Sequence, residues 1–359
     1  MLSACPRCNA ARRPHSAAAL GGPIGDGGAT ARFDAGLARA GTGGRDAVID
    51  FHVHIMDPSL IPEGGERTLS NRPGWPERLT DPHAQIADMV QRGIDCHVVG
   101  QSNVIQGISW GDAQTDLAVH RRINDNIAEH WVAAHPERFI GVFGLPTQDL
   151  RLAIPELERA VTELGLRVLQ ISSCTAEGVY YGDPRLHPLW EAIEALGVIV
   201  FIHPHGQANA PPLDEFALFN SVGQSIEEAK VMSSLIYQGI FDKYPRVKIV
   251  MAHGGGFLPH YYGRIDRNVA NFPDSTVNIS RYPSDYFREF FFDSCVYSPD
   301  VMAALIKVVG VDRIVLGGDY PVGSDDPIGL LRATPGLAED DVQAIIRHNP
   351  SALLFPVLQ

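Results

Sequence analysis

Short apolar runs alternate with longer segments of helical periodicity from Val48 onward. An apolar run of about four to eight residues, bounded by turn residues, is typical of a strand that is buried on both faces. Eight strand-helix units of this kind follow one another, which predicts a parallel sheet. The predicted strands are Val48–His52, Cys96–Val99, Phe139–Phe143, Arg167–Ile171, Val198–Ile202, Lys248–Ala252, Phe290–Asp293 and Arg313–Leu316.

Three helix starts support this division of the chain. Asp81-Pro82, Asp183-Pro184 and Ser298-Pro299 each offer a capping oxygen followed by a proline at the first helical position. Eight strand-helix units in about 310 residues fit a (β/α)8 TIM barrel, whereas an open doubly wound sheet usually has fewer strands. We therefore predict an α/β fold of the barrel type, with the loops at residues 55–80 and 205–222 as walls of the active site.

Residues 1–45 differ from the rest of the chain. They are rich in Gly, Ala and Arg and have no sustained period, so we expect a flexible, disordered arm, or an upstream stretch included by a wrong choice of start codon. Residues 46–359 are predicted to form a single catalytic domain.

Charge and hydropathy narrow the class of ligand. The net charge is −13, from 29 basic and 42 acidic side chains, which argues against nucleic acid and against an anionic membrane surface. No apolar run approaches the roughly 18 residues that a membrane span needs. We expect a soluble, cytoplasmic protein whose ligand is a small molecule. Five cysteines, an odd number scattered along the chain, suit reduced thiols, and Cys5-x-x-Cys8 lacks a second pair at zinc-finger spacing.

The first predicted strand ends in two histidines, in the sequence Ile49-Asp50-Phe51-His52-Val53-His54. Alternate residues of a strand point to the same side, so the imidazoles of His52 and His54 project about 7 Å apart toward one point. This separation lets both rings reach a metal ion at about 2 Å. Taken alone, the pair is also compatible with two ordinary polar residues at the end of a strand.

Three further strands end in residues of the same kind. His203-Pro204-His205 follows the fifth predicted strand, His253 precedes three glycines after the sixth, and Gly317-Gly318-Asp319 follows the eighth. The carboxyl ends of barrel strands converge on one face. These histidines and Asp319 therefore surround one cavity, a set suited to Zn²⁺ or Mn²⁺ with a position left for water.

These segments resemble the amidohydrolase superfamily, in the branch typified by aminocarboxymuconate semialdehyde decarboxylase. The similarity runs from about Val48 to the C-terminus and is most specific in residues 247–257, continuing to Gly263-Arg264, and in residues 313–321. The resemblance implies that His52, His54, His203 and Asp319 are the metal ligands. It also implies that His253 acts beside the metal in acid-base chemistry, with Asp319 sharing the handling of protons.

The positions of the lysines indicate how many metal ions the site holds. Many hydrolytic members of the superfamily hold two metals with a carbamylated lysine at the end of the fourth strand. None of the four lysines of this chain lies at that position. We therefore expect one divalent ion, with Zn preferred and Mn as the alternative.

Arginines are the natural clamps for a carboxylate substrate. Arg264 matches an arginine that reaches into the neighbouring subunit's site in the family, which implies a homodimer. For a second clamp Arg67, Arg72 and Arg78 compete, and we take Arg72 as the candidate. His205 is placed in the cavity wall as a substrate contact, because the family ligand is the histidine that precedes proline. Aromatic residues Trp75, Trp110 and Tyr320 are candidates for the pocket wall, although such residues more often serve packing.

The predicted function is that of a carbon-carbon lyase, a carboxy-lyase. The resemblance implies non-oxidative decarboxylation of an unsaturated or aromatic carboxylic acid, of the aminocarboxymuconate semialdehyde or hydroxybenzoate type. The alternative is a mononuclear metal-dependent hydrolase or hydratase of the same superfamily, which would use the same four ligands. A third class, a metal-stabilised scaffold without turnover, is disfavoured because all the ligands face the loop end of the barrel.

Overall fold

Eight parallel strands follow one another around the molecule in chain order. The computed structural model describes residues 46–60, 74–205, 213 and 215–355. The strands are β1 (Ile49–Ile55), β2 (Cys96–Gln101), β3 (Phe139–Phe143), β4 (Val168–Ile171), β5 (Ile199–Ile202), β6 (Lys248–Met251), β7 (Phe290–Asp293) and β8 (Ile314–Val315). The last strand returns to the first, because Phe51 N–H donates to the Leu316 carbonyl at 2.8 Å and Val53 bridges Tyr320 in parallel. The predicted (β/α)8 TIM barrel is confirmed.

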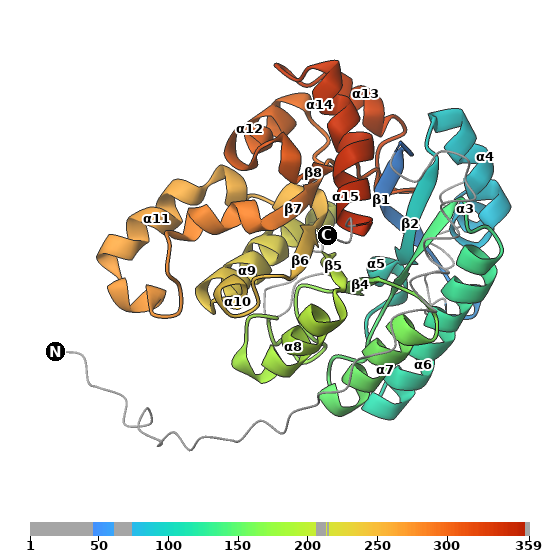
Figure 1. Ribbon diagram of the computed structural model, residues 1–359, viewed down its shortest axis with the longest axis horizontal. Coiled ribbons are helices and arrows are strands. Elements are labelled where there is room, and N and C mark those ends of the chain that lie inside the picture. The colour runs from blue at the N-terminus through green and yellow to red at the C-terminus, as the bar shows by residue number, and fades with distance from the viewer. Residues whose placement is uncertain (1–45, 61–73, 206–212, 214, 356–359) are drawn as a thin grey trace.

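Helices surround the strands on the outside (Figure 1). The α-helices are α3 (Trp75–Thr80), α4 (Pro82–Arg92), α5 (Asn103–Gln106), α6 (Ala113–Asn126), α7 (Leu150–Thr162), α8 (His187–Leu196), α9 (Gln224–Tyr237), α10 (Ile240–Lys243), α11 (Tyr262–Asn271), α12 (Pro299–Val309), α13 (Pro327–Arg332), α14 (Glu339–Gln343) and α15 (Asn349–Leu354). Shorter 3-10 or π segments are η1 (Pro58–Leu60), η2 (Ile127–Ala133), η3 (Pro184–Leu186), η4 (Glu215–Ala217), η5 (Phe219–Gly223), η6 (Ala252–Gly255), η7 (Leu258–His260), η8 (Pro273–Thr276), η9 (Pro283–Glu289), η10 (Val311–Arg313) and η11 (Ala344–His348).

Two apolar layers explain why the strands read as continuous hydrophobic runs. Side chains alternate between the two faces of a strand. In β4, Val168 belongs to the cluster inside the barrel, and its neighbour Leu169 belongs to the cluster between strands and helices. Both residues are fully buried. Because each face of the sheet meets other side chains, neither face needs polar residues until the strand ends.

The eight predicted strands all exist, and their ends differ by a few residues. Two predictions, Phe139–Phe143 and Phe290–Asp293, match β3 and β7 at both ends. The largest difference is at β1, which continues to Ile55, so that both histidines of the His-x-His pair lie within the strand. The shortest strand is β8, which has only two residues where four were predicted.

The predicted helix starts are also found. Asp81 caps α4 by accepting a hydrogen bond from His83 N–H, and Asp183 caps η3, which leads into α8. Ser298 precedes Pro299 at the start of α12, but its side chain makes no capping hydrogen bond.

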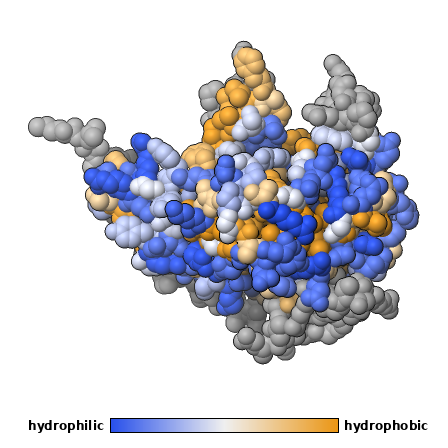
Figure 2. Space-filling view, turned by 90° about the horizontal axis from the view of Figure 1, so that it is seen from above, coloured by the Kyte–Doolittle hydropathy of each residue, from blue (hydrophilic) through white to orange (hydrophobic). Residues whose placement is uncertain are grey.

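None of the helices in the described residues is long and apolar enough to cross a membrane. The face of the molecule shown in Figure 2 is mostly hydrophilic, with one apolar projection standing out from it. Cys96, Cys174 and Cys295 are buried free thiols, as the sequence predicts. Cys5 and Cys8, like the rest of residues 1–45, lie outside the described residues.

Candidate metal centre and active site

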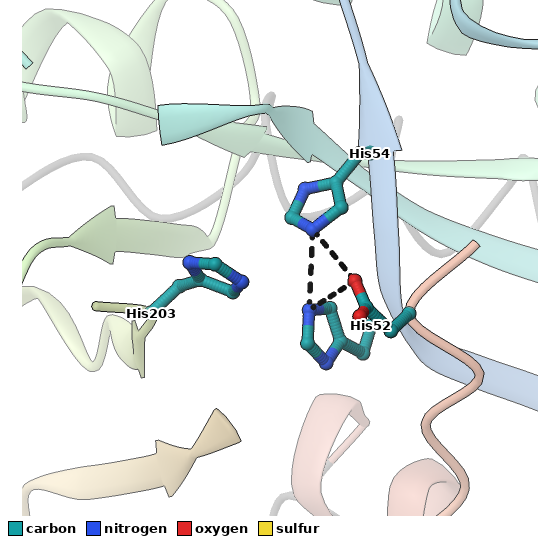
Figure 3. Close-up of side chains that lie close together, drawn as sticks. His52, His54 and His203 are labelled. Carbon is teal, nitrogen blue, oxygen red and sulfur yellow. Dashed lines mark hydrogen bonds and ion pairs between the residues drawn. The ribbon is translucent and has the colours of Figure 1, made fainter. Parts of the chain in front are cut away.

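The polar ends of four strands meet at the carboxyl-terminal mouth of the barrel. His52 and His54 project from the same side of β1, and His203, which follows β5, is directed toward them (Figure 3). Asp319 follows β8 and completes a group of four whose ligand atoms all lie within 4.8 Å of one another. The four residues lie between 0% and 6% exposed, so water has little access to them.

The spacing of these atoms fits a single cation. His52 Nε2 lies 3.3 Å from His54 Nε2, and both nitrogens are close to Asp319 Oδ1, at 3.3 Å and 3.0 Å. Two ligands bound tetrahedrally at about 2.0 Å from one ion are separated by about 3.3 Å. His203 turns its Nδ1 toward the Pro204 carbonyl at 2.9 Å, which leaves its Nε2 available. Three imidazoles and a carboxylate therefore form a site for one divalent metal ion.

The electrostatic environment keeps these groups in the state that a metal requires. Burial lowers the pKa of His54, and it lowers the pKa of His203 well below its usual value, so both rings are neutral at pH 7. Burial alone would raise the pKa of Asp319, but the neighbouring His52, His253 and His54 outweigh it and hold this pKa well below the usual range. Neutral imidazoles and an ionised carboxylate are the forms that bind divalent cations.

Two carboxylates that the sequence analysis did not single out support the first strand. Asp293, at the end of β7, lies with Oδ2 2.6 Å from His52 Nδ1, and its Oδ1 accepts from the backbone of Gly254 and Cys295. Asp50 accepts from the backbone N–H groups of His52 and Gly318 at 3.0 and 2.9 Å. Asp293 thereby holds the His52 proton on Nδ1 and leaves Nε2 for the ion. In the sequence, Asp293 stands out only as a carboxylate at the end of a predicted strand, and Asp50 only as a carboxylate in the middle of one.

His253 lies beside the four candidate ligands and outside their group. It follows β6 in the left-handed backbone region, at φ 48°, and its Nε2 is 3.8 Å from Asp319 Oδ2. Its Nδ1 is 2.5 Å from Glu228 Oε1, on α9, a residue that the sequence analysis missed. Burial lowers the pKa of His253, but the Glu228 and Asp319 carboxylates outweigh it and raise this pKa well above its usual value. The arrangement therefore places a ring that can carry a proton next to the metal centre.

The remaining predicted site residues that the structure describes lie outside this group of four. His205 directs Nδ1 to the Asn103 carbonyl at 2.6 Å and lies outside the group of four candidate ligands. Arg264 is exposed on α11. Arg67 and Arg72 lie outside the described residues, and Arg78 pairs with Asp88 at 2.9 Å.

A cleft opens over the metal centre between α9, η7 and the loop after β7. Its lining includes Trp75, His253, Phe257, Tyr297 and Asp319. The Tyr297 hydroxyl donates to Asp319 Oδ2 at 2.8 Å, another contact that the sequence did not predict. Of the three aromatic candidates, only Trp75 is part of this lining. Trp110 donates to the Gln106 carbonyl and Tyr320 to Asp88, so both serve packing elsewhere.

Comparisons with known proteins show the family of the chain. The amidohydrolase family model matches residues 49–355. The chain is 34% identical over 331 residues to a 2-amino-3-carboxymuconate-6-semialdehyde decarboxylase from Dictyostelium discoideum, covering 86% of this chain and 90% of that protein.

Two solved structures show the same fold. The structure of 5-carboxyvanillate decarboxylase from Sphingomonas paucimobilis superposes with a TM-score of 0.76 at 28% identity, covering 86% of this chain and 98% of the other. A dihydroxybenzoic acid decarboxylase from Polaromonas, solved with bound manganese and the inhibitor 2-nitroresorcinol, gives a TM-score of 0.73 at 27% identity, covering 86% and 96%.

Proposed function

Because the chain belongs to the amidohydrolase family, in the branch typified by aminocarboxymuconate semialdehyde decarboxylase, we propose that it is a metal-dependent, non-oxidative decarboxylase. Its substrate is an unsaturated or aromatic carboxylic acid, of the aminocarboxymuconate semialdehyde or hydroxybenzoate type. The observation that carries the proposal is the meeting of three histidines and Asp319 at one point, with His253 beside them. The activity is assigned to a single catalytic domain, residues 46–359.

The ligands of the metal are His52, His54, His203 and Asp319. When bound there, the ion supplies positive charge that stabilises negative charge developing on an oxygen of the substrate. Zinc is our first choice because three imidazoles and one carboxylate suit its tetrahedral preference, and manganese is the alternative. The known manganese-bound decarboxylase of similar fold keeps that alternative open.

Proton transfer is assigned to His253 and Asp319. In a non-oxidative decarboxylation the bond to the carboxyl carbon breaks, CO₂ leaves, and the electron pair stays on the substrate carbon, which takes up one proton. His253 Nε2 faces the cleft and is positioned to deliver that proton. Asp319 Oδ2 accepts from the Tyr297 hydroxyl and lies 3.8 Å from His253 Nε2, so its negative charge favours the protonated form of that ring.

Substrate contacts are assigned to His205, Arg72 and Arg264. His205 is held by the Asn103 carbonyl at 2.6 Å, and we assign it to the wall of the substrate site because it follows the ligand His203 by two residues. Arg264 is exposed on α11, so it serves the active site of a second copy of the chain. Large hydrophobic side chains are exposed on α11 and in the segments that precede and follow it, as expected for a surface that another subunit covers: Phe257, Tyr261, Tyr262, Phe272, Val277 and Tyr282.

The test of the reaction combines metal analysis with product analysis. We expect about one metal per chain and release of CO₂ from at least one acid in a panel of hydroxybenzoates and carboxymuconate semialdehydes, with both lost in His52→Ala. A hydrated or cleaved product without CO₂ would overturn the decarboxylase and favour the hydratase or hydrolase that uses the same ligands.

The dimer has its own test. Light scattering of the active protein is expected to give twice the chain mass, and Arg264→Ala is expected to raise KM while leaving the metal content unchanged. A fully active monomer would overturn the shared site.

A further inference from the structure

Glu228 is a carboxylate in the protein interior, where an ionised group is energetically unfavourable. It lies on α9 with no exposed surface. Burial raises its pKa to about 7. Removing an ionised group from water is unfavourable unless a partner compensates it. The partner here is His253, whose Nδ1 is 2.5 Å from Glu228 Oε1.

The other carboxylate oxygen has no partner. Among the described residues, no hydrogen-bond donor reaches Glu228 Oε2. This oxygen faces the backbone of Gly256, where a Cβ would lie 2.8 Å from it and 2.5 Å from the Ser225 carbonyl. Gly256 has φ 64°, a left-handed conformation that glycine adopts readily. The glycine therefore leaves the room that lets Glu228 reach His253.

The contact decides which ring nitrogen of His253 faces the cleft. With Nδ1 hydrogen-bonded to Glu228, Nε2 points toward Asp319 Oδ2 at 3.8 Å. His253 lines the cleft together with Glu228. Without the carboxylate, the ring is free to rotate and to exchange its proton between the two nitrogens.

We propose that Glu228 is a positioning residue that keeps a proton on Nδ1 of His253 and fixes the ring so that Nε2 addresses the substrate carbon. The proposal rests on the proposed function, because it assigns a role to Glu228 within the proton transfer of the decarboxylation. In that step Nε2–H gives its proton to the carbon as CO₂ departs, and Nε2 is reprotonated from water in the open cleft. Glu228 accepts a hydrogen bond from Nδ1 throughout and neither gains nor loses a proton.

The adjacent residue Glu227 provides a matched control. It has the same burial on the same helix, but its carboxylate accepts from Ser173, Tyr180 and Lys230 instead of His253. Loss of a buried charge from α9 is therefore common to Glu227→Gln and Glu228→Gln, whereas contact with His253 is lost or weakened only in the second.

The kinetic test compares kcat, KM and metal content in these variants. Carboxylate partners that orient the ligand histidines of metal sites contribute about 10- to 100-fold to activity or metal affinity, and we expect the same range for a carboxylate that orients His253. We expect kcat to fall about 10-fold in Glu228→Gln, whose amide oxygen can still accept from Nδ1, and about 100-fold in Glu228→Ala. Metal content and KM stay near the wild-type values, and Glu227→Gln keeps kcat within about 2-fold. Wild-type kcat in Glu228→Gln, or a loss that parallels the loss of metal, would overturn the proposal.

A second measurement does not depend on turnover. In zinc-loaded protein with ¹⁵N-labelled histidine, we expect a far-downfield, slowly exchanging Nδ1 proton, assigned to His253 by its absence in His253→Gln. This signal should disappear in Glu228→Ala and persist in Glu227→Gln. If it is missing from the wild type, the positioning role is wrong. If the signal is present but no acid releases CO₂, the proposed function fails while the orientation of His253 by Glu228 stands.

Discussion

At the scale of single residues, the site depends on side chains that hold other side chains. His52 is fully buried, and its Nδ1 has one carboxylate partner, Asp293, at 2.6 Å. Such a partner fixes the tautomer of a ligand histidine and increases its basicity. His54 differs, because its Nδ1 has no hydrogen-bond partner among the described residues. We therefore expect the affinity of the site to depend on Asp293 strongly.

Replacement of Asp293 by asparagine tests this dependence. The amide cannot supply a negative charge to His52, so we expect the metal dissociation constant to rise about 10- to 100-fold. Competition with a chromophoric chelator would measure it. Asp312→Asn removes an exposed carboxylate that pairs with Arg288, and it is expected to leave the affinity unchanged. Equal affinities in all three proteins would contradict the role of Asp293.

The choice of ligands is tested by two histidines with similar surroundings in the sequence. His54 lies within the group of four, whereas His205 bonds to the Asn103 carbonyl outside it. We expect His54→Ala to lose most of its metal, and His205→Ala to retain about one ion per chain with a higher KM for the acid. Elemental analysis of both purified variants decides the matter, and the reverse pattern would exchange the two assignments.

At the scale of elements, mostly apolar strands carry the polar residues of the site within β1 and just after the ends of β5, β6 and β8. All seven residues of β1 are buried, including Asp50, His52 and His54. The strand tolerates the histidines because their ring nitrogens face one another and Asp319, while the His52 ring also packs edge-on against Phe201. Functional residues then follow the ends of β5, β6 and β8, where the backbone turns toward the helices. His253 and Asp319 have φ values of 48° and 53°, so the two proposed proton-handling residues both lie in strained backbone.

The helix caps allow a prediction of stability at this scale. Asp81 Oδ1 accepts from His83 N–H at 2.9 Å at the start of α4, so Asp81→Ala is expected to lower the free energy of unfolding by about 1 kcal/mol. Ser298 occupies the same position before α12, but its side chain makes no capping hydrogen bond. Ser298→Ala should therefore change the free energy of unfolding by only a few tenths of a kcal/mol. Urea denaturation of the two variants under identical metal loading compares them. A larger loss for Ser298→Ala would contradict the capping geometry.

At the scale of the whole molecule, buried histidines make the stability of the barrel depend on pH. His97 has no exposed surface, and burial lowers its pKa to about 3, while the pKa of buried His120 falls to about 4 for the same reason. The unfolded chain binds these protons near pH 6.5, so between pH 6.5 and the folded pKa values the unfolded state carries more protons. The stability due to the neutral rings is complete above pH 6.5 and is lost as the pH falls toward 4 and 3.

His97→Asn isolates one of these contributions. The asparagine amide can replace the Nδ1 donor that faces Gln85 Oε1 at 3.0 Å, but it does not titrate. The free energy of unfolding of the variant should fall less steeply between pH 6.5 and 4, by up to about 1.4 kcal/mol per pH unit. A slope equal to that of the wild type in His97→Asn would show that the ring is protonated in the folded protein.

The barrel could be predicted from the local periodicity of the sequence, and the main polar cluster from the residues at the ends of the predicted strands. Runs such as Phe139–Phe143 are recognisable alone, and the rule that strand ends converge brings His52, His203 and Asp319 to one face. The exact ends of the strands were less predictable, because they depend on pairing with the neighbouring strand. In β8 only Ile314 and Val315 pair with β7, although the apolar run in the sequence is longer.

Only the tertiary structure decided which side chains support the cluster. Asp293 and His52 are 241 residues apart, and the sequence contains no spacing that links them. The sequence offers both Glu227 and Glu228 on one helix, but only the rotation of α9 against β6 directs the second toward His253. In the same way, His203 and His205 are equivalent as residue types, and the turn after β5 separates the ring facing Asp319 from the one bonded to Asn103. Periodicity specifies which face of an element is buried, whereas partners across the barrel depend on how the elements pack.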